Sequence, residues 1–178
     1  MKKLYYSIFS FYFFISNNSF AQCDSWVQIA SYGGYIRHGA TGFSISNKGY
    51  IGAGVDNGTF KKDFWEWDQS TNAWTQIADF GGVERQFAVG FSIGTKGYVG
   101  TGYDIFNGAN SVTDFWEYNS GTNVWTQKAN FGGIARNRSI GFSIGTKGYI
   151  GTGTGAGYYS DFWEWDQSTN IWAQKANF

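Results

Sequence analysis

The amino-acid sequence predicts an all-β protein built from three copies of one four-stranded antiparallel unit. The stretch Gly90–Trp125 recurs in nearly the same wording as Gly42–Trp74 and as Gly141–Trp172. A repeat of about 50 residues indicates one structural unit stacked several times. Apolar residues alternate with small or polar ones between turn signals, and no helical period persists, which indicates strands. The 178 residues include 26 glycines and no proline, a composition that suits short strands and tight turns.

The first residues form a separate segment with the pattern of a secretory signal peptide. A basic start precedes the largely apolar run Leu4–Ser16, and small residues stand at the −3 and −1 positions of a cut after Ala21. The apolar run has 13 residues, fewer than the about 20 that a membrane-spanning helix needs. We therefore expect residues 1–21 to be removed and residues 22–178 to be secreted or held at the cell surface.

The single cysteine and the charge balance of the exported chain restrict its partners. Cys23 has no partner for an internal disulfide, so the fold must rest on packing. It could instead carry a lipid, but Gln22 stands before it, where lipoprotein cleavage requires a small residue. Removal of the signal peptide leaves 11 basic against 13 acidic side chains, without a cluster of Lys and Arg. This argues against nucleic acid and against a polybasic contact with a membrane, and no membrane-spanning segment is expected.

Four strands are expected in each unit, and the middle copy illustrates them. The first is expected at Phe87–Ile93, the second at Tyr98–Gly102, the third at Asp114–Tyr118 and the fourth at Val124–Lys128. A hairpin turn at Gly94–Gly97 joins the first two strands, since glycine supplies the positive φ that tight hairpins need. Alternate residues of the first strand are apolar, so they should share one face of the sheet.

Length differences among the copies fall in one connection, the loop between the second and third strands. This loop spans residues 55–62, 103–113 and 154–160, which gives 8, 11 and 7 residues. In an antiparallel unit it lies at the same end as the crossover to the next unit, where the chain reads SYGGYIR, DFGGVER or NFGGIAR. Loops that vary in length lie at the surface and often carry specificity. We therefore expect a binding face at this end.

These residues resemble the kelch repeats of secreted bacterial proteins, each of which forms one four-stranded blade of a β-propeller. The resemblance rests on glycines that close the second strand, on an aromatic third strand and on the turn Asp68–Trp74, which recurs as Asp166–Trp172. The chain departs from the pattern where the family's paired glycines are interrupted, as in Gly52-Ala53-Gly54. The resemblance implies a kelch-type propeller segment of three four-stranded antiparallel blades.

The resemblance also implies the bounds of the blades, at about residues 31–78, 79–129 and 130–178, preceded by an orphan outer strand at 26–30. Three blades are fewer than the roughly 4–8 of closed propellers, so an open arc of a larger propeller is expected, with the missing blades downstream. The alternative is a homodimer in which two chains complete a six-bladed ring.

Three arginines occupy equivalent positions in the crossovers. They are Arg37, Arg85 and Arg136. In kelch propellers, residues near this point line the mouth of the central channel, so the resemblance implies that the arginines could hold an anionic group. Alternatively, each arginine pairs with a carboxylate of its own blade, and recurrence in every copy favours this fastening because functional sites rarely repeat uniformly. The carboxylates considered as partners are Glu66, Glu117 and Glu164.

Residues that differ between the copies at the same rim are better candidates for specificity. They are Tyr35, His38, Glu84, Gln86 and Arg138. A lone histidine does not define a nucleophilic relay, so no catalytic residue is assigned. One histidine and one cysteine cannot supply the ligands of a zinc site or of a copper centre of the galactose oxidase type. We therefore expect neither a metal site nor a cofactor.

Two repeated features have competing interpretations. The acids that open the third strand could cap turns or bind calcium, and they are Asp63, Asp114 and Asp161. The aromatic pairs of the third strand, such as Trp65 and Trp67, could stack on sugars or form the core between blades. Their repetition favours the core.

The expected function is that of a secreted, non-catalytic binding or scaffold module that presents variable loops to a protein or glycan ligand. The alternative is part of a carbohydrate-active propeller enzyme resembling the sialic-acid mutarotases. That function requires an acid–base pair near the channel, for which Glu84 with Arg85 is the nearest approach. In a third alternative, activity requires a complete ring and this chain alone has none.

Overall fold

The computed structural model describes residues 25–105 and 110–177, so the predicted signal peptide and Cys23 lie outside the described residues. The described chain forms sixteen strands and no helix. It accordingly contains no helical segment with the length and apolar character needed to cross a membrane. Twelve strands form three four-stranded antiparallel sheets, which we call blades one, two and three, and the other four form two short hairpins.

The strands of each blade pair in chain order. Blade one contains β1 (Thr41–Ile45), β2 (Lys48–Gly52), β5 (Phe64–Asp68) and β6 (Ala73–Ile77). Blade two contains β7 (Val89–Ile93), β8 (Lys96–Gly100), β11 (Phe115–Asn119) and β12 (Val124–Gln127). Blade three contains β13 (Ile140–Ile144), β14 (Lys147–Gly151), β15 (Phe162–Asp166) and β16 (Ile171–Lys175). The short hairpins are β3 (Val55–Asp56) with β4 (Thr59–Phe60) and β9 (Tyr103–Asp104) with β10 (Asn110–Ser111). The all-β fold class with three antiparallel blades is confirmed.

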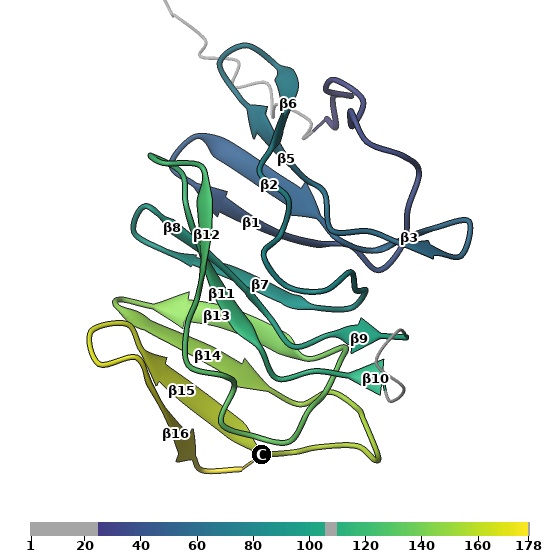
Figure 1. Cartoon of the computed structure of the whole chain (residues 1–178). Coiled ribbons are helices and arrows are strands. Elements are labelled where there is room, and N and C mark those ends of the chain that lie inside the picture. The colour runs from purple at the N-terminus through teal and green to yellow at the C-terminus, as the bar shows by residue number, and fades with distance from the viewer. Residues whose placement is uncertain (1–24, 106–109, 178) are drawn as a thin grey trace, which may run out of the picture.

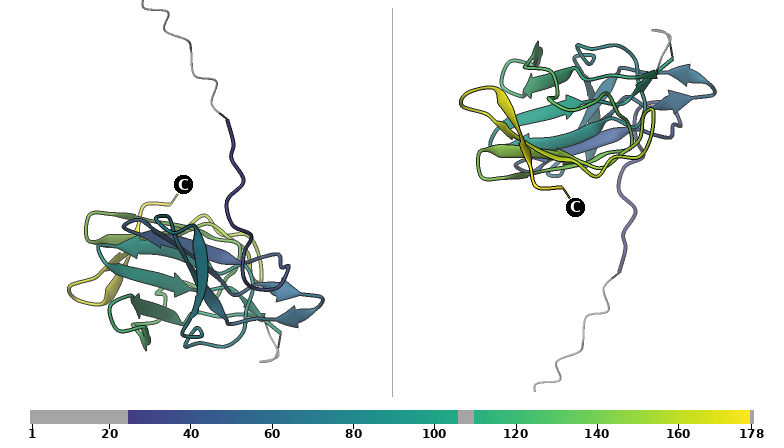
Figure 2. Two further views of the ribbon diagram at one scale, coloured as in Figure 1. Left: turned by 90° about the horizontal axis from the view of Figure 1, so that it is seen from above. Right: turned by 90° about the horizontal axis from the view of Figure 1, so that it is seen from below.

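The blades stack side by side, with blade one at the top of Figure 1 and blade three at the bottom. The first strands of neighbouring blades are in contact, β1 with β7 and β7 with β13. The two short hairpins project from the same side of the stack, opposite the turns that join the first and second strands (Figure 1). In the end views of Figure 2, the described residues at the N-terminus lead away from the sheets.

Each turn between the first and second strands contains two residues, fewer than the four expected. In blade two, β8 therefore begins at Lys96, two residues before the predicted Tyr98. Gly94, the first turn residue, has a φ of 57°, and the equivalent Ser46 and Gly145 have φ of 54° and 58°. A positive φ at the first of two turn residues is the requirement of a type II′ hairpin, whose twist matches that of the flanking strands.

Aromatic rings of one blade pack into spaces left by glycines of the next. Phe91 in β7 is only 5% exposed, and its ring lies over Gly148 of blade three. The approach is so close that a Cβ on Gly148 would lie 2.4 Å from the ring. Phe43 of blade one lies over Gly97 of blade two in the same way, at 2.1 Å. Glycine is needed at these two positions because any side chain would push the blades apart.

The two outer faces of the stack carry the same groups without a neighbouring blade. On blade three, Ile140, Phe142 and Ile144 are 64%, 41% and 64% exposed, whereas the equivalent residues of β7 are buried. On blade one, a Cβ added to Gly49 would meet only the side chain of Trp67, at 3.8 Å. Phe142 therefore lacks the contact with a glycine that Phe43 and Phe91 make, and Gly49 lacks the contact with an aromatic ring that Gly97 and Gly148 make.

Residues 26–30, predicted as an orphan outer strand, form no strand in the structure. Trp26 is fully exposed, and the segment is held at Ala30. The Ala30 N–H donates to Asn72 Oδ1 at 3.0 Å, and its carbonyl accepts from the indole of Trp74 at 3.0 Å. Ala78, which follows β6, is bound by blade two through the same pair of contacts. Ala30 thus takes the position of a residue that ends a preceding blade, while the segment before it has no sheet to pair with.

Candidate functional site

The crossovers and the variable loops lie together at one end of the blades, as predicted. In each blade, a crossover residue forms an isolated bridge with a residue of the loop between the second and third strands. The bridged pairs are His38 with Val55, Gln86 with Tyr103 and Asn137 with Thr154. We call this end of the blades, on the side of the short hairpins in Figure 1, the loop face.

The crossover arginine of blade two is completely buried and fully hydrogen-bonded. Arg85 is 0% exposed, and its two terminal nitrogens donate to the carboxylate of Asp114 at 2.5 and 2.6 Å. The same guanidinium donates to the carbonyl of Thr101 at 2.9 Å and to that of Val83 at 3.0 Å. Bidentate contacts of this kind are among the strongest hydrogen bonds in proteins. Arg85 therefore fastens the crossover to the second and third strands of its blade.

Blades one and three repeat this fastening with Arg37 bound to Asp63 and Arg136 bound to Asp161. The expectation that Glu66, Glu117 and Glu164 are the partners is wrong. These glutamates accept hydrogen bonds from the hydroxyls of Tyr50, Tyr98 and Tyr149 on the neighbouring second strands. The indoles of Trp65, Trp116 and Trp163 donate to the aspartates at 2.9, 2.8 and 2.7 Å. Hydrogen bonds from Arg136 hold the pKa of the Asp161 carboxyl below its ordinary value.

Each arginine also holds a strained residue where the second strand ends. Ala53, Thr101 and Thr152 have φ of 55°, 56° and 60°, a region that costs a residue with a β-carbon free energy. The carbonyl of each accepts a hydrogen bond from the arginine of the same blade. These are the positions where the chain departs from paired glycines. The three arginines therefore have a structural role in every blade, and their guanidinium groups already have counter-ions.

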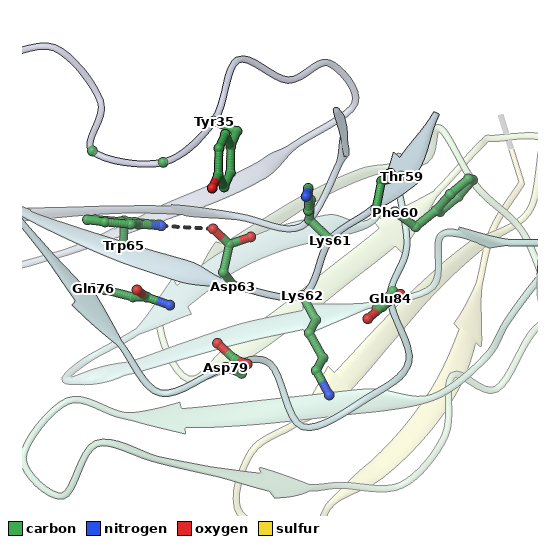
Figure 3. Close-up of a pocket in the computed structure, with 12 residues that line it drawn as sticks. Tyr35, Thr59, Phe60, Lys61, Lys62, Asp63, Trp65, Gln76, Asp79 and Glu84 are labelled. Carbon is green, nitrogen blue, oxygen red and sulfur yellow. Dashed lines mark hydrogen bonds between the residues drawn. The ribbon is translucent and has the colours of Figure 1, made fainter. Parts of the chain in front are cut away.

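A pocket of about 720 Å³ opens on the loop face of blade one. In Figure 3, Tyr35 lies above and Asp79 below, with Asp63 between them and with Trp65 and Glu84 to the left and right. The ammonium of Lys61 lies 5.0 Å from the centre of the Tyr35 ring. We call this cavity the loop-face pocket. It combines the aromatic residues Tyr35, Phe60 and Trp65 with carboxylates and with two lysines, Lys61 and Lys62.

A second pocket, of about 360 Å³, lies where blades two and three meet. Its lining is Gln86, Phe87, Tyr103, Asn137, Arg138 and Thr154. The Arg138 guanidinium lies over the Phe87 ring, 4.4 Å from its centre, and the backbone N–H of Arg138 donates to the Phe87 carbonyl at 3.1 Å. We call this cavity the junction pocket. The structure thus brings together two of the predicted specificity residues, Gln86 and Arg138.

The other predicted residues lie elsewhere on the loop face. Tyr35 and Glu84 line the loop-face pocket, and His38 is exposed with its ring 6.5 Å from that of Phe87. Arg85 does not join Glu84 in an acid–base pair, because Asp114 binds its guanidinium.

Sequence reasoning missed Lys61 and Phe87 as lining residues. Lys61 belongs to the variable loop of blade one, so the length variation already marked its neighbourhood. Phe87 was assigned to the first strand, but its φ is 56°. Its equivalent in blade one is Gly39, with a φ of 64°. A glycine at this position of the repeat was the available signal for a left-handed residue.

Within residues 25–105 and 110–177, no three His, Cys, Asp or Glu side chains group together as metal ligands. The repeated aspartates, considered as calcium ligands, are instead bound to the arginines and indoles described above.

The three blades define a chain of the β-propeller fold, and the comparisons agree with this class. The solved structure of YjhT matches with a TM-score of 0.73 at 18% sequence identity, covering 84% of this chain and 54% of that one. The chain therefore spans about half the length of that structure, and at this identity the likeness shows the fold alone. No family model matches the chain, and no curated protein matches it.

Proposed function

We propose that the chain is a divergent kelch-type module, exported by its signal peptide to the cell surface or medium, that binds a protein or glycan without catalysing a reaction. The observation that supports this proposal is the loop-face pocket, which lies at the end of the blades where the repeats differ in length. Arg85, half of the acid–base pair considered for a mutarotase-like enzyme, is buried in its ion pair with Asp114. A binding role is therefore favoured over that alternative.

The chemistry of the loop-face pocket favours a glycan. Tyr35 is 68% exposed with Lys61 over one face of its ring, and Trp65 is partly exposed with Gly33 against its ring, so the uncovered part of each ring can contact the apolar face of a sugar. Gln76 and Asp79 are exposed in the same lining and can bind sugar hydroxyls as donors and acceptors. Pockets of about 300–1,000 Å³ are usual for small ligands, and this pocket lies within that range.

The test is to probe an array of neutral and acidic oligosaccharides with labelled residues 22–178. Tyr35→Ala should weaken binding to the retained glycans by about tenfold or more, a change of about 1.4 kcal/mol. Tyr158→Ala is the matched control, since Tyr158 is 96% exposed in the loop of blade three and lies outside the pocket. Equal loss in both variants, or no retained glycan, would contradict the glycan proposal. Conversion of a retained sugar between its anomers would favour the enzyme alternative.

We also propose that a second copy covers the open faces of the stack, with Phe142 of one copy over Gly49 of the other. The support is the recurrence of one contact at both internal boundaries, with these two residues left over at the ends. A head-to-tail contact of this kind closes when two copies supply six blades, within the roughly 4–8 of closed propellers. Ala30 occupies the position where the last strand of the second copy would dock, so closure has to displace it.

Light scattering across a concentration series tests the second copy. Gly49→Ala is the discriminating variant, because within one chain its methyl group meets only Trp67 at 3.8 Å, whereas Phe142 of a second copy would collide with it. Gly121→Ala, in an exposed turn, is the control. A dimer that Gly49→Ala weakens and Gly121→Ala preserves is expected. A monomer at all concentrations, or a dimer indifferent to Gly49→Ala, refutes the arrangement.

A further inference from the structure

We infer that the loop-face pocket is one end of a groove that binds a neutral oligosaccharide lengthwise across blades one and two. This inference rests on the proposed function, since it names the kind of glycan that the loop-face pocket takes. Its evidence is a second cavity of about 540 Å³ on the loop face of blade two, which we call the blade-two pocket. Lys62 and Glu84 line both cavities, so the two adjoin. In Figure 3, the Lys62 side chain points away from Tyr35.

The two cavities are built from the same positions of the repeat. Each is lined by two crossover glycines, by the residue after them, and by an aspartate and a tryptophan at the third strand. In the loop-face pocket these residues are Gly33, Gly34, Tyr35, Asp63 and Trp65. In the blade-two pocket they are Gly81, Gly82, Val83, Asp114 and Trp116. Tyr35 is 68% exposed and Val83 is 40% exposed, so each cavity offers an apolar side chain. Two like surfaces in succession match a chain of like units, which is the chemistry of a linear oligosaccharide.

The charges that line the groove disfavour an acidic sugar. The two aspartates of the shared positions are bound by arginines of their own blades, and Lys61 pairs with Asp56. Lys62, Asp79 and Glu84 also line the groove, and none of them forms an ion pair with a residue in the described ranges. Two carboxylates against one ammonium leave a negative excess, which repels an anionic ligand. Neutral hydroxyls can donate to the carboxylates and accept from the ammonium.

The repeat does not continue the groove onto blade three. Ile134, which takes the position of Val83 there, lines a different cavity with Asn137 and Tyr159. Among the described residues, that cavity shares none of its lining with the blade-two pocket. The groove is therefore limited to blades one and two, and Ile134 provides a matched comparison for Val83.

The dependence of affinity on ligand length tests the groove. Calorimetric titration of residues 22–178 compares the disaccharide and the hexasaccharide of neutral β-linked series built from glucose, xylose, mannose or N-acetylglucosamine, and of an acidic series built from galacturonate. In the neutral series that binds most tightly, the hexasaccharide should bind at least about twentyfold more tightly than the disaccharide, because it alone reaches both cavities. The several registers of a hexasaccharide on a single two-unit site account for only about fivefold. The galacturonate hexasaccharide should bind at least about tenfold more weakly than the neutral one.

Two variants connect the length dependence to the blade-two pocket. Val83→Arg places a bulky side chain in that pocket, so the hexasaccharide should bind within about fivefold of the disaccharide, whose own affinity should not change. Ile134→Arg makes the same change of size and charge at the equivalent position of blade three and should leave both affinities unchanged. Urea unfolding confirms that both variants are folded.

The outcomes separate this inference from the proposed function. A hexasaccharide that binds no more than about fivefold more tightly than the disaccharide, equal effects of Val83→Arg and Ile134→Arg, or tighter binding of the galacturonate series would overturn the groove. In each of these cases the glycan proposal for the loop-face pocket stands. Absence of binding in every series contradicts the glycan proposal itself, and the groove falls with it.

Discussion

Replacing Asp114 with alanine should destabilise the chain strongly, because it leaves a buried positive charge without a counter-ion. Arg85 is 0% exposed, whereas the Asp114 side chain is 20% exposed and lines a pocket, so water can replace the carboxylate only in part. The change removes both ends of the bidentate contact, at 2.5 and 2.6 Å, and the acceptor of the Trp116 indole at 2.8 Å. The two carbonyls that also bind Arg85 remain, but they carry no negative charge.

The expected loss is set by what breaking a buried ion pair costs. Removal of one partner from such a pair typically costs about 3–5 kcal/mol, compared with about 1 kcal/mol or less for an exposed pair. The free energy of unfolding of an ordinary domain is about 5–15 kcal/mol, so Asp114→Ala should remove a large part of it. Asp56→Ala is the matched control. The Asp56 carboxylate lies 3.8 Å from the Lys61 ammonium, and the side chains of this pair are more exposed than those of Arg85 and Asp114.

Urea unfolding followed by tryptophan fluorescence gives the free energies of unfolding by linear extrapolation. The double variant Arg85→Met with Asp114→Leu separates the charge from the packing. Replacing a buried pair with apolar groups of similar volume is often close to neutral, so the double variant should be more stable than Asp114→Ala. A loss below about 1 kcal/mol for Asp114→Ala would refute the interpretation of this pair as a buried fastening.

Three further outcomes follow from the packing and the burial of side chains. Gly97→Ala should lower the free energy of unfolding by about 1–3 kcal/mol because its Cβ would lie 2.1 Å from the Phe43 ring. Gly49→Ala should have little effect on the monomer, and equal urea midpoints for the two variants would contradict this. Thr101→Gly should raise the free energy of unfolding by about 1 kcal/mol, since Thr101 has a φ of 56° and its buried hydroxyl has no hydrogen-bond partner among the described residues. A lower urea midpoint than that of the wild type would count against strain at this position. Burial raises the pKa of Tyr118 to about 12 from the ordinary 10.0, so the unfolded chain loses this proton first and stability should fall as the pH rises above about 10. Tyrosinate absorbance and tryptophan fluorescence recorded together check this, and a folded chain whose tyrosines all titrate near pH 10 would speak against it.

The blades and the loop face could be predicted from the sequence because both are properties of the repeat. The counter-ions of the arginines could not. Glu117 and Asp114 recur equally well in the third strand, and spacing alone does not tell which of them faces the crossover. In the structure, the hydroxyl of Tyr98 donates to Glu117, while Asp114 lies one residue before β11 and contacts Arg85. The choice depends on how the crossover returns over the sheet, which is a tertiary feature.

The candidate sites were predictable as residues but not as groups. Gln86 and Arg138 stand in different repeats, and the stacking of blade two on blade three brings them to one pocket. Comparison of the copies identified both as residues that differ, but it gave no reason to associate them. Phe87 was assigned to the first strand, whereas in the structure it has a left-handed φ and its N–H donates to the Gly39 carbonyl of blade one. Contacts between blades therefore decide what the repeat alone leaves open.

Arg136 and Arg138 show how two equal side chains in one segment acquire opposite roles. Arg136 is 0% exposed and bound to Asp161, whereas Arg138 is exposed and its φ of 57° takes the chain towards the junction pocket. Arg136→Gln should therefore cost about 3–5 kcal/mol of unfolding free energy and act on ligands only through the fold. Arg138→Gln loses only a contact with the Phe87 ring, so it should cost less than about 1 kcal/mol. Urea unfolding of the two variants side by side tests this difference, and similar losses of unfolding free energy would mean that Arg138 stabilises the fold as Arg136 does.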